Sequence, residues 1–213
     1  MKKKLDLVSL AEHLAKTQSK ARRIVAIVGA PGAGKSTFSE ALQVELSGRV
    51  HSDLLSMDGF HFDDIVLNAR GDRSRKGAPH TFDVKGFATT LARLVQDNGD
   101  EVAVPVFDRS IEIARAGARI IKPEARLIIS DGNYLLLDDP SWIPLQNFFD
   151  LTVFLKVPEQ ELEKRLFARW KAFGLSEEEI RVKLEGNDLI NARLVLRSSR
   201  PADITINNGV SRP

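Results

Sequence analysis

One glycine-rich segment, GAPGAGKST, limits what this chain can fold into more than any other feature. It directly follows the apolar run 24–28 and matches the pattern G-x-x-x-x-G-K-[ST]. In such a loop the backbone N–H groups wrap the phosphates of a nucleotide, the lysine reaches the β- and γ-phosphates, and the serine hydroxyl can ligate Mg²⁺. The predicted nucleotide-binding residues are Gly29, Ala30, Pro31, Gly32, Ala33, Gly34, Lys35, Ser36 and Thr37.

The residues around this segment favour a phosphate loop over an ordinary glycine-rich turn. Segment 36–46 carries Phe38 and Leu42 on one helical face, and Ser47-Gly48 offers a helix stop. A bound phosphate would lie at the N-terminus of that helix, where unpaired N–H groups and the helix dipole favour an anion. A surface turn requires neither the strand before the loop nor the helix after it. We therefore expect a fold of the P-loop NTPase class.

Short apolar segments that alternate with helical patterns predict the rest of the fold. Further candidate strands lie at 54–57, 102–107, 126–130, 151–157 and 204–206. Candidate helices lie at 5–16, 36–46, 84–96, 159–172 and from 176 onward, with a break near Gly186. This alternation predicts an α/β fold with a central, mostly parallel sheet and helices on both faces. Pro105 cannot donate to a ladder, so its segment should be an edge strand or no strand.

The chain of 213 residues has no convincing linker or internal repeat, and its length fits one domain, 1–213. Segment 60–118 is poor in long periodic elements. We expect it to be a substrate-binding insertion over the carboxyl edge of the sheet, where ligands bind in open α/β folds. The helical segment 159–175 is the predicted lid.

Composition excludes several classes of protein. Hydrophobic residues make up 43% of the chain and charged residues 28%, as in ordinary soluble proteins. A net charge of +2 gives no reason to expect a nucleic-acid partner, and the absence of cysteine excludes disulfides and thiol catalysis. No apolar run approaches the roughly 18 residues of a membrane span, and no apolar signal-peptide core follows Lys2–Lys4. We expect a cytoplasmic protein with a small-molecule substrate. The oligomeric state stays open.

Three predicted strands end in a carboxylate, at Asp58, Asp108 and Asp131. Because the carboxyl ends of parallel strands meet at one edge, we expect all three near the γ-phosphate. Asp58 could take the proton from an attacking hydroxyl, and Asp131 could hold Mg²⁺ together with Ser36. The alternative is that aspartate simply favours the turns that follow strands.

Two arginines, Arg165 and Arg169, stand four residues apart on the predicted lid helix. Arginines that close over a triphosphate would neutralise the charge that develops in the transition state. The alternative is a solvated basic face paired with Glu161 and Glu163. Our predicted catalytic set is Asp58, Lys35, Arg165 and Arg169.

The segment RSRKGAPHTFDV, 73–84, is either a plain surface loop or a substrate loop. As a substrate loop, it would let Asp83 accept from a hydroxyl while Phe82 packs against a sugar or base. The predicted substrate-binding residues are His61, Lys76, Asp83, Asp108 and Arg109. Polar side chains outnumber aromatic ones between 58 and 102, which favours a hydroxyl-rich acceptor, because such a pocket discriminates through hydrogen bonds. A nucleoside is the alternative.

Five motifs, GAPGAGKST, SMDGFHFDD, RKGAPHTFD, VPVFDRS and ISDGNYLLL, together resemble those of one kinase superfamily. It is the group of uridine kinase, pantothenate kinase and phosphoribulokinase. Within it, the motifs are most similar to those of the small bacterial proteins called fructose transport system kinases, or fructokinase-like P-loop kinases. The resemblance covers roughly residues 24–207.

The resemblance implies roles for particular residues. Asp58 matches the catalytic base, Asp83 and Asp108 match positions near the acceptor, and Arg165 and Arg169 match the arginine-bearing lid. One departure is Asp131-Gly132, where relatives such as uridine kinase have Glu-Gly. The shorter carboxylate favours contact with Mg²⁺ through water.

We therefore expect an ATP- and Mg²⁺-dependent kinase that phosphorylates a hydroxyl of a small metabolite, a sugar such as fructose. Uridine-like nucleosides and pantothenate-type acceptors are the alternatives. A GTP-dependent switch should carry an N-K-x-D motif, and the sequence holds none. A regulatory or transport-accessory ATPase without an acceptor of its own is the remaining class.

Overall fold

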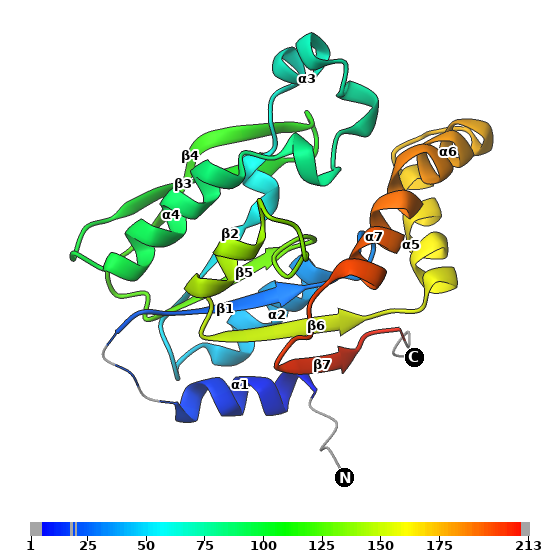
Figure 1. The fold of residues 1–213 in the computed structure, drawn as a ribbon. Coiled ribbons are helices and arrows are strands. Elements are labelled where there is room, and N and C mark those ends of the chain that lie inside the picture. The colour runs from blue at the N-terminus through cyan, green and yellow to red at the C-terminus, as the bar shows by residue number, and fades with distance from the viewer. Residues whose placement is uncertain (1–5, 18, 20, 210–213) are drawn as a thin grey trace.

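The computed structural model describes residues 6–17, 19 and 21–209. Its central sheet has five strands in the order β2-β5-β1-β6-β7, and every neighbouring pair is parallel (Figure 1). The strands are β1 (Arg23–Val28), β2 (Ser52–Ser56), β5 (Leu127–Gly132), β6 (Leu151–Lys156) and β7 (Ile204–Asn207). The predicted α/β fold with a parallel sheet is confirmed.

Helices flank this sheet on both faces. The helices of the described residues are α1 (Leu7–Lys16), α2 (Lys35–Leu46), α3 (Asp64–Arg70), α4 (Val84–Gln96), α5 (Glu159–Ala172), α6 (Glu177–Lys183) and α7 (Leu189–Ser198), of which α3 and α6 lie away from the sheet (Figure 1). In Figure 1, α1 and α2 lie on one side of the sheet and α4 on the other. In the described part of the chain, no helix is long and apolar enough to cross a membrane.

The predicted helices agree with these elements. The first begins at Leu7, and the part of the prediction at residue 5 falls outside the described residues. The predicted break near Gly186 is a π-helical turn, Leu184–Asp188, between α6 and α7. Its sequence, LEGND, combines glycine, asparagine and aspartate, which are all poor helix formers.

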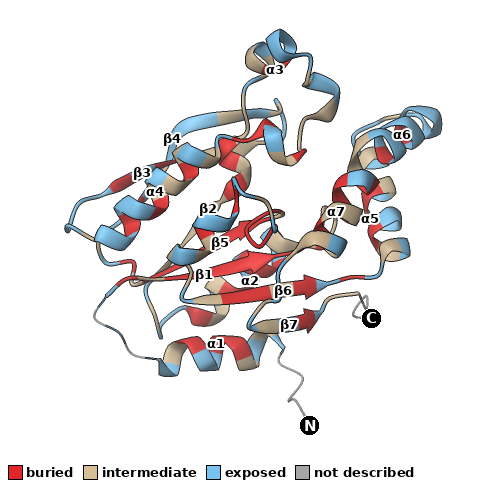
Figure 2. Cartoon of the chain, viewed as in Figure 1, coloured by how far each residue is buried: buried red, intermediate tan, exposed pale blue. Residues whose placement is uncertain are grey.

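The middle of the sheet forms the core. All six residues of β5 are buried, as are five of the six in β1 (Figure 2). Strands that are covered on both faces have continuous apolar sequences, and for this reason these two strands could be predicted from the sequence. The helix α1 adds Leu10, Ala11 and Leu14 from its buried side. This rigid base fixes the loops that leave its carboxyl edge.

One predicted strand does not belong to the central sheet. The strand β3 (Val102–Asp108) pairs antiparallel with β4 (Ile113–Ile121) in a separate two-stranded ribbon. Its register shifts between Val104 and Val106, at Pro105, which has no N–H to donate. The sequence did not predict β4, because alternating alanine and arginine give no apolar run.

A glycine allows this ribbon to approach the central sheet. A Cβ at Gly59 would lie 2.5 Å from the carbonyl oxygen of Pro105, so only glycine fits there. Gly59 follows β2 in the one-turn 3₁₀ helix Met57–Phe60. The predicted insertion 60–118 contains α3, α4, β3 and part of β4. Its substrate-binding role and the single-domain organisation stay predictions.

Candidate active site

The nine predicted phosphate-loop residues run from the end of β1 into the first turn of α2. Gly32 and Gly34 both have a φ of +81°, which favours glycine. Gly34 is the N-cap of α2 and has no side chain to occupy the first-turn N–H groups. Those free N–H groups and the helix dipole favour an anion at the loop. The loop therefore has the backbone arrangement of a phosphate site.

Lys35 is the cation of this loop. Its Nζ donates to the carbonyl oxygen of Ala30 at 3.2 Å and to Oδ1 of Asn133 at 2.5 Å. Burial lowers the pKa of Lys35 to about 8, against the opposing charges of Asp58 and Asp131. A bound phosphate would stabilise the ammonium and raise that pKa again. Asn133 was not among the predicted residues, although it directly follows the Asp131-Gly132 pair.

Asp131 lies across the loop from Lys35, at the end of β5. The hydroxyl of Ser36 donates to its Oδ2 at 3.0 Å. Asp131 is buried, and burial followed by the charge of Asp58 raises its pKa to about 6. The described residues contain no group of three or more His, Cys, Asp or Glu able to hold a metal. Ser36 and Asp131 nevertheless fit Mg²⁺ if oxygens of a nucleotide complete the coordination.

Asp58 follows β2 in the 3₁₀ helix Met57–Phe60, and its side chain is 21% exposed. Burial alone would raise the pKa of this carboxyl, but His61, Arg109 and Lys35 hold it below its ordinary value. Burial in turn lowers the pKa of His61, so near neutral pH the charged neighbours are the arginine and the lysine. Asp58 is thus ionised and open to a ligand, as a general base must be.

His61 and Phe107 form an aromatic wall beside Asp58. The centre of the His61 ring lies 4.0 Å from the ring centre of Phe82 and 4.8 Å from that of Phe107. Its Nδ1 is 2.7 Å from the carbonyl oxygen of Asp58. Because a carbonyl can only accept, Nδ1 carries the proton, and Nε2 of the neutral ring is an acceptor. The wall therefore offers a flat face and one hydrogen-bonding edge.

Two predicted cations also lie here. Arg109 donates from Nη2 to Oδ2 of Asp58 at 2.6 Å. Lys76 donates to Asp64 at 2.6 Å and to the carbonyl oxygen of Glu112 at 2.7 Å, and its Nζ is 5.5 Å from the ring centre of Phe107. Arg109 is thus placed to reach a ligand of Asp58, whereas Lys76 stabilises the wall.

The remaining predicted carboxylates have other partners. Asp83 is the N-cap of α4 and accepts from the N–H of Gly86 at 2.9 Å. Asp108 accepts from Ser110 and from Arg115. The expectation that Asp108 ends a strand of the parallel sheet is wrong, because β3 lies in the separate ribbon. Neither residue is therefore part of the proposed acceptor site.

The two arginines of the predicted lid differ in their surroundings. Arg165 donates to Glu161 and to the carbonyl oxygen of Asn208, each at 2.9 Å. The amide of Asn208 donates in turn to Ala33 in the phosphate loop at 2.8 Å. Arg169 instead interacts electrostatically with Asp188 and, less strongly, with Asp58. Arg165 therefore stabilises the rim of the nucleotide site, and Arg169 lies within electrostatic reach of both Asp188 and the candidate base.

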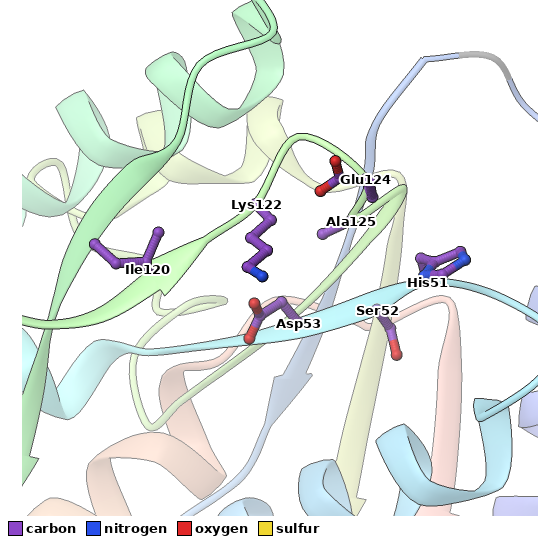
Figure 3. A pocket seen from close by; sticks show the side chains of 7 residues that line it. All are labelled: His51, Ser52, Asp53, Ile120, Lys122, Glu124 and Ala125. Carbon is purple, nitrogen blue, oxygen red and sulfur yellow. The ribbon is translucent and has the colours of Figure 1, made fainter.

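A pocket elsewhere on the molecule is separate from this site. It lies where β2 begins and β4 has ended, and its lining includes His51, Asp53, Lys122 and Glu124 (Figure 3). The strand ends that carry Asp58 and Asp131 are at the opposite edge of the sheet. The candidate active site is instead the place where the side chains of Lys35, Asp58 and Asp131 converge.

The fold and the site together define a P-loop kinase. No protein-family model matches the chain. An Escherichia coli protein named YggC, of uncharacterised function, is 36% identical over 188 residues, which cover 87% of this chain and 77% of that one. A Schizosaccharomyces pombe protein provisionally named a uridine kinase is 30% identical over 210 residues, which cover 94% and 88%.

A solved structure is similar throughout. A protein from Silicibacter sp. TM1040, provisionally named a fructose transport system kinase, matches with a TM-score of 0.88 and 40% identity. The match covers 94% of this chain and 98% of that one. This chain belongs to the group of P-loop kinases that includes uridine kinase, pantothenate kinase and phosphoribulokinase.

Proposed function

We propose that the protein is an ATP-dependent kinase that transfers the γ-phosphoryl group to a hydroxyl of a small metabolite, a sugar or sugar-like polyol such as fructose. One observation carries the proposal. Asp58, an ionised and partly exposed carboxylate, lies close enough to Lys35 of the phosphate loop for each to shift the pKa of the other.

In the proposed reaction, the acceptor hydroxyl donates its proton to Asp58 while its oxygen forms a bond to the γ-phosphorus. The bond from that phosphorus to the β–γ bridging oxygen breaks, and ADP leaves with the bonding electrons. Lys35 and Arg169 stabilise the charge on the phosphoryl oxygens, which is the main demand of phosphoryl transfer. Mg²⁺ held by Ser36 and Asp131 would neutralise further phosphate charge when bound.

The surroundings of Asp58 support a hydroxyl-rich acceptor. Arg109 and the Nε2 edge of His61 offer one donor group and one acceptor group beside the base. A polyol that uses both leaves neither polar group unpaired, and this is how a site rejects poorer ligands. In this proposal α5 is the lid and 60–118 supplies the acceptor site.

A nucleoside acceptor is the second candidate. The half-buried ring of Phe107, next to His61, could stack on a base. The S. pombe relative named a uridine kinase favours the same reading.

ADP release measured with and without acceptor tests the proposal. We expect turnover to require fructose or a related polyol, with uridine, cytidine, pantothenate and glycerate as competitors in the same screen. Lys35→Met serves as the inactive control. If uridine or cytidine is phosphorylated and no sugar is, the acceptor is a nucleoside and the proposed polyol is wrong. If the rate of ADP release does not depend on any acceptor, the protein is better described as an ATPase module.

A further inference from the structure

The π-helical turn 184–188 is hydrogen-bonded to a segment more than a hundred residues earlier in the chain. Arg75 donates from Nη1 to the carbonyl oxygen of Gly186 at 2.6 Å. Asn187 donates from its amide to the carbonyl oxygen of Lys76 at 2.7 Å. These bonds join the segment 73–77, which leads to the wall beside Asp58, to the helices beyond the lid.

A buried amide reinforces this junction. Asn191, only 2% exposed, donates to Oδ1 of Asn187 at 3.0 Å and accepts from Arg75 at 3.4 Å. Separating the two segments would leave the amide oxygen of this buried side chain without its bond from Arg75, which is costly. The poor helix formers of LEGND add little stability of their own, so tertiary bonds hold the turn in its π-helical form.

The same turn is bonded to the lid helix on its other side. Asp188 accepts from the indole Nε1 of Trp170 at 2.6 Å. The guanidinium of Arg169 lies 5.1 Å from the ring centre of that tryptophan. The lid arginine, the indole, the turn and the segment 73–77 therefore form one continuous series of contacts.

The segment 73–77 is also attached near the phosphate loop. The hydroxyl of Tyr134, a fully buried residue, donates to the carbonyl oxygen of Gly77 at 2.6 Å. Tyr134 directly follows Asn133, the partner of Lys35. The segment thus lies between the nucleotide loop on one side and the lid on the other.

We infer that the turn 184–188 couples the lid to the acceptor side of the site, and that Arg75 and Asn187 are the positioning residues of this coupling. The inference rests on the proposed kinase function. When a nucleotide draws Arg169 toward its phosphates, Trp170 and Asp188 transmit that ordering to the segment 73–77. Single π-helical turns within helices are frequent at functional sites.

Amide hydrogen exchange with Mg²⁺ and the non-hydrolysable analogue AMP-PNP tests this coupling without an acceptor. In the wild-type protein we expect exchange to slow about five-fold or more both in α5 and in 73–77, the lower end of coupling between two sites. In Asn187→Ala, α5 should still be protected and 73–77 should not. Asn147→Ala, the same change at an exposed residue, should behave like the wild type.

The outcomes separate the two proposals. If AMP-PNP slows exchange nowhere, the proposed nucleotide site fails. If it protects α5 but not 73–77 in the wild type, or protects 73–77 equally in Asn187→Ala, the coupling is wrong. Arg75→Lys, which keeps the charge but removes the guanidinium fork, should give the same loss as Asn187→Ala. If Asn187→Ala does not melt cooperatively and therefore is not folded, the Arg75→Lys variant tests the coupling in its place.

Discussion

The guanidinium of Arg109 contacts the carboxylate of Asp58 at 2.6 Å, although the two residues belong to different parts of the fold. Asp58 follows β2 of the central sheet, whereas Arg109 follows β3 of the two-stranded ribbon. Their side chains are 21% and 44% exposed, so solvent screens the pair and its value for stability is small. The contact matters instead for the charge and position of the candidate base.

Replacing Arg109 should change the pH dependence of catalysis. Arg109 is one of the charges that hold the pKa of Asp58 below its ordinary value. Without it that pKa rises, so Asp58 becomes protonated at a higher pH. In Arg109→Ala the acidic limb of the profile of kcat/KM should therefore move to higher pH. Arg115→Ala, another ribbon arginine, which pairs with Asp108, is the control. An unmoved acidic limb would contradict the assigned role.

Asp58→Asn should separate nucleotide binding from catalysis. Loss of a positioned general base typically costs 10²- to 10⁴-fold, so we expect turnover to fall about 10²-fold or more. Affinity for Mg²⁺–AMP-PNP should stay nearly unchanged, because Lys35 and the loop N–H groups remain. Asp108→Asn should retain most activity. A variant that loses nucleotide affinity but turns over normally when saturated would make Asp58 a structural or metal-binding residue.

The two lid arginines should give different kinetic defects. Arg169→Ala removes a guanidinium within electrostatic reach of Asp58 and should lower kcat about 10²-fold or more, the scale of one lost transition-state donor. Arg165→Ala removes contacts to Glu161 and Asn208 and should mainly weaken nucleotide binding. Steady-state kinetics and melting curves check both, with exposed Lys171→Ala as the control. Equal effects of the two variants on kcat would argue against this division.

Lys35→Met should abolish transfer and weaken nucleotide binding, because the β- and γ-phosphates lose their cation. A second signature follows from the pKa of about 8 that burial gives the ligand-free lysine. Near or above that pH a fraction of the lysine is neutral, so nucleotide binding takes up a proton. Calorimetry in buffers of different ionisation enthalpy measures this uptake, which should disappear in the variant. Wild-type transfer by Lys35→Met would overturn the site.

Asp131 should link pH to both stability and metal binding. Burial raises its pKa from 3.8 to about 6, so the folded, ligand-free protein holds this proton more tightly than the unfolded chain. Its contribution to stability therefore decreases as the pH rises from about 4 to about 6. Asp131→Asn should raise the melting temperature at neutral pH without metal.

Metal dependence provides the complementary measurement. Mg²⁺ requires the ionised carboxylate, so affinity for the Mg²⁺-nucleotide should fall in the wild type as the pH drops below about 6. Asp131→Asn should weaken metal binding about 10- to 100-fold. Asp100→Asn, an exposed change, should do neither. A lower melting temperature for Asp131→Asn at neutral pH would show that Asp131 is needed for folding rather than for metal.

The sequence by itself determined the elements whose signals are local. The apolar runs of β1 and β5 and the pattern of GAPGAGKST placed the phosphate loop, because a strand, a loop and a helix in succession need only short-range information. The helices 84–96 and 159–172 have the bounds that their periodicity predicted. The expectation that Asp58 and Asp131 lie at the same edge of the sheet followed from the rule that parallel strands end at one edge.

Only the tertiary structure decided which distant segments meet. Asp108 also ends a strand, but that strand lies in the separate ribbon. Neither periodicity nor propensity indicates which strands pair. The contacts of Arg109 with Asp58 and of Arg75 with Gly186 join residues 51 and 111 positions apart. Such contacts depend on how whole elements pack, so a side chain's type predicts its chemistry while its partner is fixed only by the assembled fold.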